Sequence, residues 1–185
     1  MRIIRGKYKG RHIPIPTHFM ARPTTDFAKE GLFNILENNY VDFTDDAITA
    51  LDLFAGTGSI GLELVSRGCS RVVSVEKDFK QWQFLQRVAK ELNATEWLPV
   101  HADVFKFCKQ SREQYDIVFA DPPYALPNLR DIPETVLGTA DHPEDSLLKD
   151  DGIFILEHGK NYDFTQHPRF LSHRNYGSVH FSFFR

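Results

Sequence analysis

From residue 47 onward, apolar runs of strand length alternate with segments whose apolar residues recur at helical spacing. Such alternation predicts βαβ units around a parallel sheet with helices on both faces, and therefore an α/β fold. The predicted strands are 47–54, 71–75, 97–101, 116–121 and 152–157. The predicted helices that separate the first four of them are 59–67, 79–92 and 104–109.

The C-terminal segment departs from this pattern. Residues 170–174 and 179–184 have strand character, and the turn sequence Asn175-Tyr176-Gly177-Ser178 between them predicts an antiparallel hairpin. The sheet is therefore expected to be seven-stranded and mostly parallel, with an antiparallel edge. Residues 125–150 form an acidic segment with prolines, which we interpret as a loop and a short helix covering a site.

Residues 1–24 form a basic arm ahead of the alternating pattern. Residues 1–22 hold six basic residues and no Asp or Glu, so this stretch carries +6 and the rest of the chain −9, for a net charge of −3. Apolar and aromatic residues alternate with the charges, which predicts a β-ribbon that binds a polyanion, with a solvated face as the alternative. Pro23 to Asp26 then predict the start of an amphipathic helix over 27–36.

Composition indicates one globular domain, over 25–185, after the arm. The 185 residues are 42% hydrophobic and 25% charged, with no apolar signal segment or membrane-length run, so we expect a cytoplasmic protein that does not use a membrane. Cys69 and Cys108 lie far apart and are expected to be reduced thiols in or near the core. The eight histidines are scattered and expected mostly at the surface, so no metal site is predicted.

A glycine-rich loop follows the first predicted strand, with the sequence Ala55-Gly56-Thr57-Gly58-Ser59-Ile60-Gly61. This G-x-G-x-x-G match alone also fits a dinucleotide site. A pyrophosphate needs backbone amides without a nearby anion, whereas Asp52 precedes the loop and no Lys or Arg lies between Asp52 and Glu63. Charge therefore favours a cationic cofactor, S-adenosyl-L-methionine, which carries a sulfonium and an ammonium but no phosphate.

Further carboxylates follow the next predicted strands. Glu76 is placed to accept both ribose hydroxyls of such a cofactor, Asp103 to bind the adenine amino group, and Asp121 ends the fourth strand. In open α/β sheets the carboxyl ends of the strands line the ligand crevice, so acids at all these positions favour a site over a chance surface pattern. The predicted cofactor contacts are Asp52, Phe54, Ala55, Gly56, Thr57, Gly58, Ser59, Glu76, Lys77, Asp103 and Val104.

The tetrapeptide Asp121-Pro122-Pro123-Tyr124 is the predicted catalytic segment. Proline cannot continue a central strand, so the exit of the strand is fixed and presents the Asp121 carboxylate and backbone carbonyls as acceptors. Tyr124 adds a flat ring beside them. Acceptors with a stacking surface suit a planar amine such as a nucleobase with an exocyclic amino group, although a Pro-rich turn with a surface Tyr remains an alternative.

Taken together, these segments resemble the RsmD-type 16S ribosomal RNA guanine-N(2) methyltransferases. The resemblance rests on 2–11, on 22–26 with 31–36, on 51–59 and on 121–124. The glycine loop and the tetrapeptide are shared with many amino-methyltransferases, and the basic arm followed by Arg22-Pro23-Thr24 distinguishes this family. The resemblance implies a Rossmann-like class I methyltransferase fold and methylation of a guanine 2-amino group in small-subunit RNA, within an assembling particle and by a monomer. The RNA contacts predicted with it are Arg5, Lys7, Lys9, Arg11, Arg22 and Thr24.

Other functions remain open at this point. Some members carry Phe where this chain has Tyr124, and the Asp form of the tetrapeptide also occurs in DNA adenine methyltransferases, so the base is not fixed by this motif. The same chemistry on DNA adenine or on a protein glutamine, and a non-catalytic nucleic-acid-binding module with this fold, are the alternatives. The four strand-end acids argue against the non-catalytic module, and the absence of a separate target-recognition domain argues against a DNA enzyme.

Overall fold

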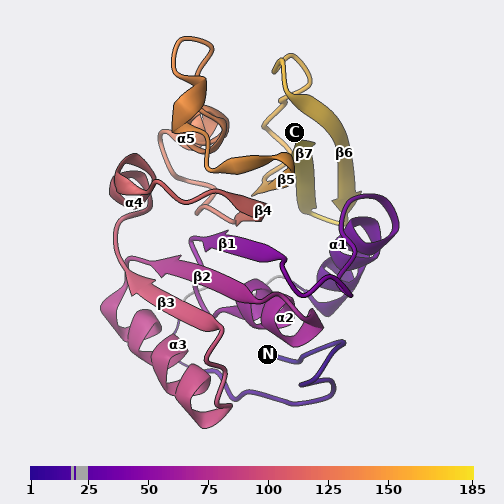
Figure 1. Cartoon of the computed structure of the whole chain (residues 1–185), viewed down its shortest axis with the longest axis vertical. Helices are drawn as coiled ribbons and strands as arrows, with labels where there is room; N and C mark the ends of the chain where they lie inside the picture. Colours follow the sequence, from indigo (N-terminus) through magenta and orange to yellow (C-terminus); the bar gives the residue numbers. More distant parts are fainter. Residues whose placement is uncertain (18, 20–24) are drawn as a thin grey trace.

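The computed structural model describes residues 1–17, 19 and 25–185. Within these residues, seven strands form one sheet in the order β3-β2-β1-β4-β5-β7-β6 (Figure 1). The strands are β1 (Thr49–Leu53), β2 (Arg71–Glu76), β3 (Trp97–His101), β4 (Tyr115–Ala120), β5 (Leu148–His158), β6 (Phe170–Tyr176) and β7 (Val179–Phe184). The helices are α1 (Asp26–Asn39), α2 (Ser59–Arg67), α3 (Phe79–Glu91), α4 (Val104–Gln110) and α5 (Ile132–Leu137), with 3-10 turns η1 (Leu129–Asp131) and η2 (Pro143–Asp145).

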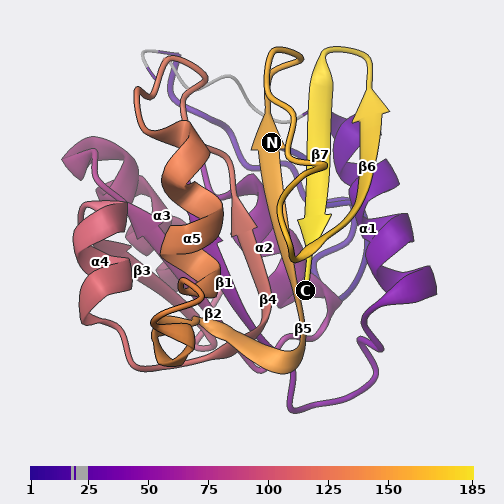
Figure 2. The same ribbon diagram turned by 90° about the horizontal axis from the view of Figure 1, so that it is seen from above.

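Helices cover both faces of the sheet (Figure 2). Successive residues of a strand point to opposite faces, so Ala50 packs in the core that α1, α2 and α3 share. Leu51 and Leu53 point to the opposite face and pack in the second core, with α4 and α5. Because both faces are buried, the inner strands are mostly apolar, with a few polar residues such as Asp52 and Ser74, which is why they appear as apolar runs in the sequence.

The winding of the sheet reverses at β1. This strand pairs in parallel with β2 on one side and with β4 on the other, and β5 continues in parallel beside β4. At such a reversal the loops after two neighbouring strands diverge and leave a crevice at their carboxyl ends. β7 then joins β5 antiparallel and β6 pairs with β7, so the predicted antiparallel edge is confirmed.

The segment 125–150 contains the expected short helix, but most of it does not cover the crevice. The apolar side chains of α5 are buried in the second core, where Ile132 and Val136 are at most 1% exposed. Burying this apolar stripe determines where the helix lies. Only Leu126 of the segment lines the crevice, and the turn between β6 and β7 borders it as well.

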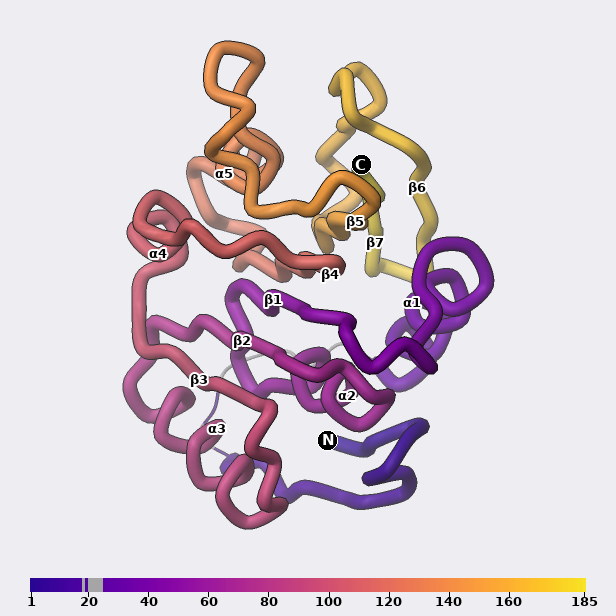
Figure 3. The backbone as a smooth tube through the Cα atoms, in the orientation of Figure 1, coloured from indigo at the N-terminus to yellow at the C-terminus, as the bar shows by residue number. Residues whose placement is uncertain are grey.

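The basic arm folds back on itself and runs alongside α2 toward the end of α3 (Figure 3). Ile3 N donates to Arg11 O at 3.1 Å and Gly10 N donates to Ile3 O at 2.9 Å, but among the described residues of the arm only Arg2 and His12 form a β-bridge. Gly6 and Gly10, with φ of 84° and 79°, bend the chain between them. Residues 1–13 of the arm thus form an irregular hairpin and not the β-ribbon that the sequence predicts.

Other expectations about the core meet a mixed outcome. Cys69 and Cys108 are free and buried, as predicted. The described histidines are exposed or half-buried, as expected for most of them, except His158 at the end of β5, which is only 1% exposed and whose pKa burial lowers to about 4. None of the helices in the described part of the chain combines the length and apolarity needed to cross a membrane.

Candidate active site

A pocket of about 850 Å³ lies at the carboxyl ends of the central strands. This volume is within the range of small-molecule sites. The predicted residues that line it are Asp52, Phe54, Ala55, Gly56, Thr57, Ser59, Glu76, Lys77, Asp103, Val104, Asp121, Pro122, Pro123 and Tyr124. Gly58 is the exception, because it faces the protein interior: a Cβ there would lie 2.5 Å from Leu85 and 2.7 Å from Trp97.

The loop after β1 turns sharply at the edge of the pocket. Phe54 and Gly56 both have left-handed backbone angles, with φ of 60° and 55°. Such a conformation is uncommon for a residue with a Cβ, and in this loop Phe54 is held by its neighbours: Ala55 N donates to Val75 O at 3.0 Å. The turn brings the backbone of 54–57 to the pocket wall and starts α2 at Ser59.

Asp52 lies at the floor of the pocket and is tied to the protein. Its Oδ2 accepts hydrogen bonds from Gly61 N at 3.0 Å and Ser74 Oγ at 3.1 Å, and the residue is 2% exposed. Burial raises the pKa of Asp52 to about 7. These hydrogen bonds connect β1 to α2 and β2, so Asp52 has a structural role in addition to any contact with a cofactor.

Glu76 and Asp103 occupy neighbouring positions at the ends of β2 and β3. Glu76 Oε2 accepts from Gly56 N and Oε1 from Asp78 N, both at 2.7 Å, so this carboxylate fixes the glycine loop while facing the pocket. Asp103 caps α4 through Lys106 N at 3.3 Å and pairs with Lys77 at 3.1 Å. The hydrogen bond from Lys77 lowers the pKa of Asp103, so this carboxyl is anionic at neutral pH.

The tetrapeptide forms the wall opposite the glycine loop. Asp121 N donates to Leu53 O at 3.3 Å, which extends the pairing of β4 with β1 by one residue and places the Asp121 carboxyl at the switch point. Pro122 is buried, whereas Tyr124 is 41% exposed at the mouth of the pocket. The Tyr124 hydroxyl donates to Glu157 Oε1 at 3.2 Å, which fixes the orientation of its ring.

Glu157 is a pocket residue that the sequence analysis did not include. It is the last residue of the predicted strand 152–157, so the strand-end rule that found Glu76 and Asp121 also applies to it. Burial raises the pKa of Asp121 well above its usual value, and the charges of Glu157 and Asp52 raise it further. Strongly perturbed carboxyls in a pocket are typical of functional sites.

Other residues reach the pocket only through the tertiary structure. Thr25, from the start of α1, and the β6–β7 turn at 176–179 line one side. On the other side lies Gln81 of α3, whose Oε1 is a buried acceptor without a hydrogen-bond partner among the described residues. No sequence motif marks these positions, because they are brought in by packing between distant segments.

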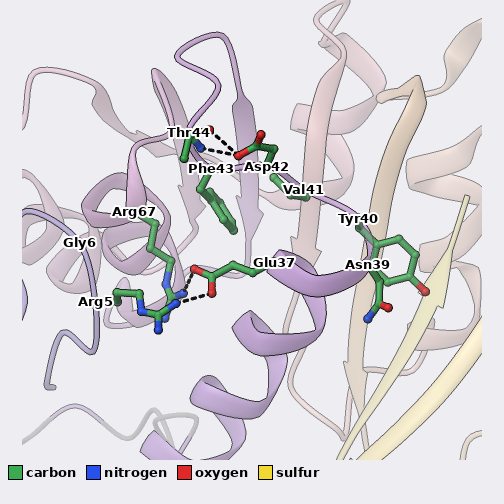
Figure 4. Close-up of a pocket in the computed structure, with 10 residues that line it drawn as sticks. All are labelled: Arg5, Gly6, Glu37, Asn39, Tyr40, Val41, Asp42, Phe43, Thr44 and Arg67. Atoms are coloured by element: carbon green, nitrogen blue, oxygen red, sulfur yellow. Dashed lines mark hydrogen bonds and ion pairs between the residues drawn. The ribbon is translucent and has the colours of Figure 1, made fainter.

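The predicted RNA contacts that the structure describes do not line this pocket, and some are already paired. Arg5 Nη1 contacts Glu37 Oε2 at 2.6 Å, and Arg67 Nη1 contacts the other oxygen of Glu37 at 2.6 Å (Figure 4). Lys7 pairs with Glu96. Lys9 and Arg11 are exposed, with the Arg11 guanidinium 5.8 Å from the ring centre of Tyr8. Arg22 and Thr24 lie outside the described residues.

The arm runs along α2, with Arg2 near the pocket end of the helix and Lys7 at the far end: Lys29 Nζ donates to both Arg2 O and Ser59 Oγ. Lys7 N donates to Ser66 O at 2.8 Å, whereas Ser59, at the other end of α2, lines the pocket. Seven residues of helix separate them, a rise of about 10 Å. A ligand that contacts both Lys7 and the pocket must therefore extend along α2.

The pocket has the groups that S-adenosyl-L-methionine requires. Glu76 and Asp103 supply negative charge around it, the carboxyls of Asp52 and Asp121 add hydrogen-bonding groups, and Lys77, the one basic residue among its described lining residues, is paired with Asp103. The orphaned Gln81 Oε1 adds an acceptor that a hydroxyl or amino group of a ligand can satisfy. A cationic nucleoside fits this lining, whereas the phosphates of a dinucleotide would be repelled.

The fold and this pocket define an S-adenosylmethionine-dependent methyltransferase of the Rossmann-like class I type. The chain belongs to the family described as conserved hypothetical protein 95, whose family model matches residues 1–185. Together with the small subunit methyltransferase D relatives, this match confirms the RsmD-type family predicted from the sequence.

Relatives with known names agree with this assignment. YlbH of Bacillus subtilis, named as a proposed rRNA methyltransferase, is 32% identical over 174 residues, which are 90% of this chain and 86% of YlbH. Ribosomal RNA small subunit methyltransferase D of Escherichia coli strain K12 is 37% identical over 124 residues, 67% of this chain and 60% of that protein. A proposed methyltransferase of known structure, yhhF of Escherichia coli, superposes with a TM-score of 0.82 at 28% identity, covering 100% of this chain and 96% of yhhF.

Proposed function

We propose that this chain transfers the methyl group of S-adenosyl-L-methionine to the exocyclic 2-amino group of a guanine in 16S ribosomal RNA. One observation carries the proposal: the Asp121 to Tyr124 segment and the glycine loop with Glu76 border the same pocket. An amine held at the tetrapeptide is thereby adjacent to a cofactor held at the loop. The family membership and the names of the relatives support ribosomal RNA as the substrate.

The cofactor, when bound, supplies an electrophilic methyl group on a cationic sulfur. Glu76 would hold the ribose hydroxyls, and the acidic Asp103 with the backbone beside Val104 would face the adenine. Both carboxylates are already fixed by hydrogen bonds to backbone amides, so little further ordering is needed on binding. The negative charge around the pocket stabilises a cation placed among these groups.

The tetrapeptide orients the amine. An aromatic amine is a weak nucleophile because its lone pair is delocalised into the ring. Hydrogen bonds from its two N–H groups to the Asp121 carboxylate and the Pro122 carbonyl would direct the lone pair and stabilise the positive charge that develops during attack. The raised pKa of Asp121 also suits it to take the proton that the methylated nitrogen releases.

The target base must leave its stack to reach this pocket, because enzymes that act on a base extrude it. Tyr124, exposed at the mouth, would stack on the extruded base. Lys9 and Arg11, which are exposed on the arm, would contact phosphates further along the RNA. We further propose that the protein acts in the cytoplasm as a monomer on an assembling small subunit, with 1–24 as the RNA-binding arm and 25–185 as the catalytic domain.

The test separates cofactor binding from methyl transfer. In transfer of radiolabelled methyl groups to 16S RNA or to small-subunit particles from cells lacking the protein, Asp121→Ala should abolish activity but retain cofactor affinity in titration calorimetry. Glu76→Ala should lose both, and Asp150→Ala, which removes an exposed acid in β5, is the matched control. Tyr124→Ala should weaken base docking by about 1–3 kcal/mol.

Two results would contradict the proposal. Full activity of Asp121→Ala would exclude the proposed amine geometry. Tight binding of NAD in place of S-adenosyl-L-methionine would exclude a methyltransferase.

A further inference from the structure

The first turn of α1 carries an exposed aromatic ring beside the pocket. Phe27 is 70% exposed, more than any other large apolar side chain in the described part of the chain. Thr25, two residues earlier, lines the pocket. The ring of Phe27 also meets the ring of Tyr176, another lining residue, edge to face with the ring centres 5.6 Å apart. Phe27 therefore lies next to the wall of the pocket, with most of its ring open to a ligand.

A groove of about 350 Å³ begins at these two rings and follows α1, where the helix packs against β6 (Figure 2). We call it the α1 groove, and its lining includes Phe27, Glu30, Gly31, Asn34, Asn38 and Tyr176. Tyr176 lines both the groove and the pocket, so its side chain separates the two. Its ring packs closely on the helix, because a Cβ at Gly31 would lie 2.3 Å from ring atoms of Tyr176. The groove is therefore continuous with the wall of the pocket.

The α1 groove is built on a fixed helix face. Several of its residues recur at intervals of three or four positions and so share one face of α1: Phe27, Gly31, Asn34 and Asn38. Leu32 and Leu36, on the opposite face, are at most 1% exposed and hold the helix in the core. A ring on such a fixed helix loses little freedom when a ligand stacks on it.

The lining of the α1 groove suits a base and not a phosphate. Glu30 is the one charged residue among its described lining residues, and an anion at this position repels phosphate. The side chains of Asn34 and Asn38 are exposed, and each amide offers both donors and an acceptor, which match the edge of a base. The ring of Phe27 adds the flat apolar surface on which unpaired bases stack in RNA-binding proteins.

We propose that the α1 groove holds the unpaired nucleotide next to the target guanine, with the base of this nucleotide stacked on Phe27. This inference rests on the proposed function and assigns a second RNA contact to the same site. Extrusion of the target base also removes a stacking partner from its neighbour, and this unstacking costs free energy. The ring of Phe27 replaces the lost partner. Because Tyr176 borders both the groove and the pocket, adjacent nucleotides of one strand can occupy the two at the same time.

The test measures methyl transfer to small-subunit particles from cells lacking the protein, and cofactor affinity by titration calorimetry. Phe27→Ala should raise KM for the particles by about five- to a hundredfold through the loss of stacking. The kcat should stay unchanged, because the neighbouring nucleotide is bound equally before and during methyl transfer. Cofactor affinity should also stay unchanged, because the α1 groove shares no described lining residue with the glycine loop. Leu171→Ala, which removes a 45% exposed side chain of β6 outside the groove, is the matched control and should leave KM unchanged.

Two further variants separate stacking from packing against Tyr176. Phe27→Trp keeps a flat ring and should retain the KM of the wild type. Phe27→Leu keeps an apolar side chain beside Tyr176 but has no flat face, so its KM should rise as in Phe27→Ala. If Phe27→Leu has the KM of the wild type, Phe27 only supports the wall of the pocket and the inference is overturned. A fall in kcat or cofactor affinity in Phe27→Ala without a rise in KM overturns it as well.

Photocrosslinking identifies the molecule that occupies the groove. With photoreactive benzoylphenylalanine incorporated at position 27, a crosslink to the nucleotide next to the methylated guanine is expected. A crosslink to a ribosomal protein in place of this nucleotide would mean that the groove binds a protein, which overturns the inference.

Failure of the two proposals gives different results. A wild-type protein that does not methylate guanine in the particles overturns the proposed function, and this inference with it. A wild-type protein that methylates guanine, together with an unchanged KM in Phe27→Ala, overturns only the role of the α1 groove.

Discussion

Glu63 of α2 joins the basic arm to the rest of the protein, and its removal should destabilise the fold strongly. The residue is fully buried. Its carboxylate accepts from Ile4 N at 2.9 Å, Arg5 N at 3.0 Å and Arg67 Nε at 2.9 Å, and it lies 3.5 Å from Lys29 Nζ. Lys29 is itself 1% exposed, and burial lowers its pKa while Glu63 opposes this change.

The expected magnitude follows from the groups that Glu63→Ala leaves behind. Lys29 keeps hydrogen bonds to Arg2 O and Ser59 Oγ, but no described carboxylate remains paired with it. Breaking a buried ion pair by removing one partner costs about 3–5 kcal/mol. The amides of Ile4 and Arg5 lose their acceptor and move the total toward the upper end of that range. At about 2–4 °C per kcal/mol for a chain of this size, the melting temperature should fall by roughly 10–15 °C.

Calorimetric unfolding of the wild type, Glu63→Ala and Glu91→Ala provides the measurement. Glu91 is a matched control, because its pair with Arg87 is exposed at 3.8 Å and should contribute less than about 1 kcal/mol. Hydrogen exchange should show that Ile4 and Arg5 lose protection first in Glu63→Ala. If the two variants melt within about 2 °C of each other, the buried carboxylate does not hold the arm, and the reasoning from burial and pairing is refuted.

Two further predictions concern charge. Because the pKa of Asp52 is raised, the folded protein holds a proton between about pH 4 and 7 that the unfolded chain releases, so the free energy of unfolding should fall as pH rises through this window. Urea unfolding at several pH values should show a steeper fall for the wild type than for Asp52→Asn. Parallel curves for the two proteins would contradict this prediction. Neutralising Lys7, Lys9 and Arg11 together should reduce the slope of log RNA affinity against log salt concentration by about two to three units. Lys7 should contribute least, because Glu96 already pairs with it. An unchanged slope would mean that the arm has only a structural role.

The sequence alone predicted the elements and the acids at their ends. Strand and helix periodicities are local properties, so the bounds of α2 and β3 were predicted as the structure has them. In a parallel sheet the carboxyl ends of strands meet at one edge, and this topological rule was enough to bring Glu76, Asp103 and Asp121 to one pocket. The roles predicted for them individually stay predictions.

The tertiary structure decided how the charges are used, because pairing and burial depend on contacts between segments far apart in the chain. Glu37 and Glu96 neutralise Arg5 and Lys7, which no pattern within the arm reveals. The register of β4 against β5 places Glu157 next to Asp121. Composition shows an arm of charge +6, but only the folded chain shows that part of this charge is already paired within the protein and that Asp121 and Glu157 line the same pocket.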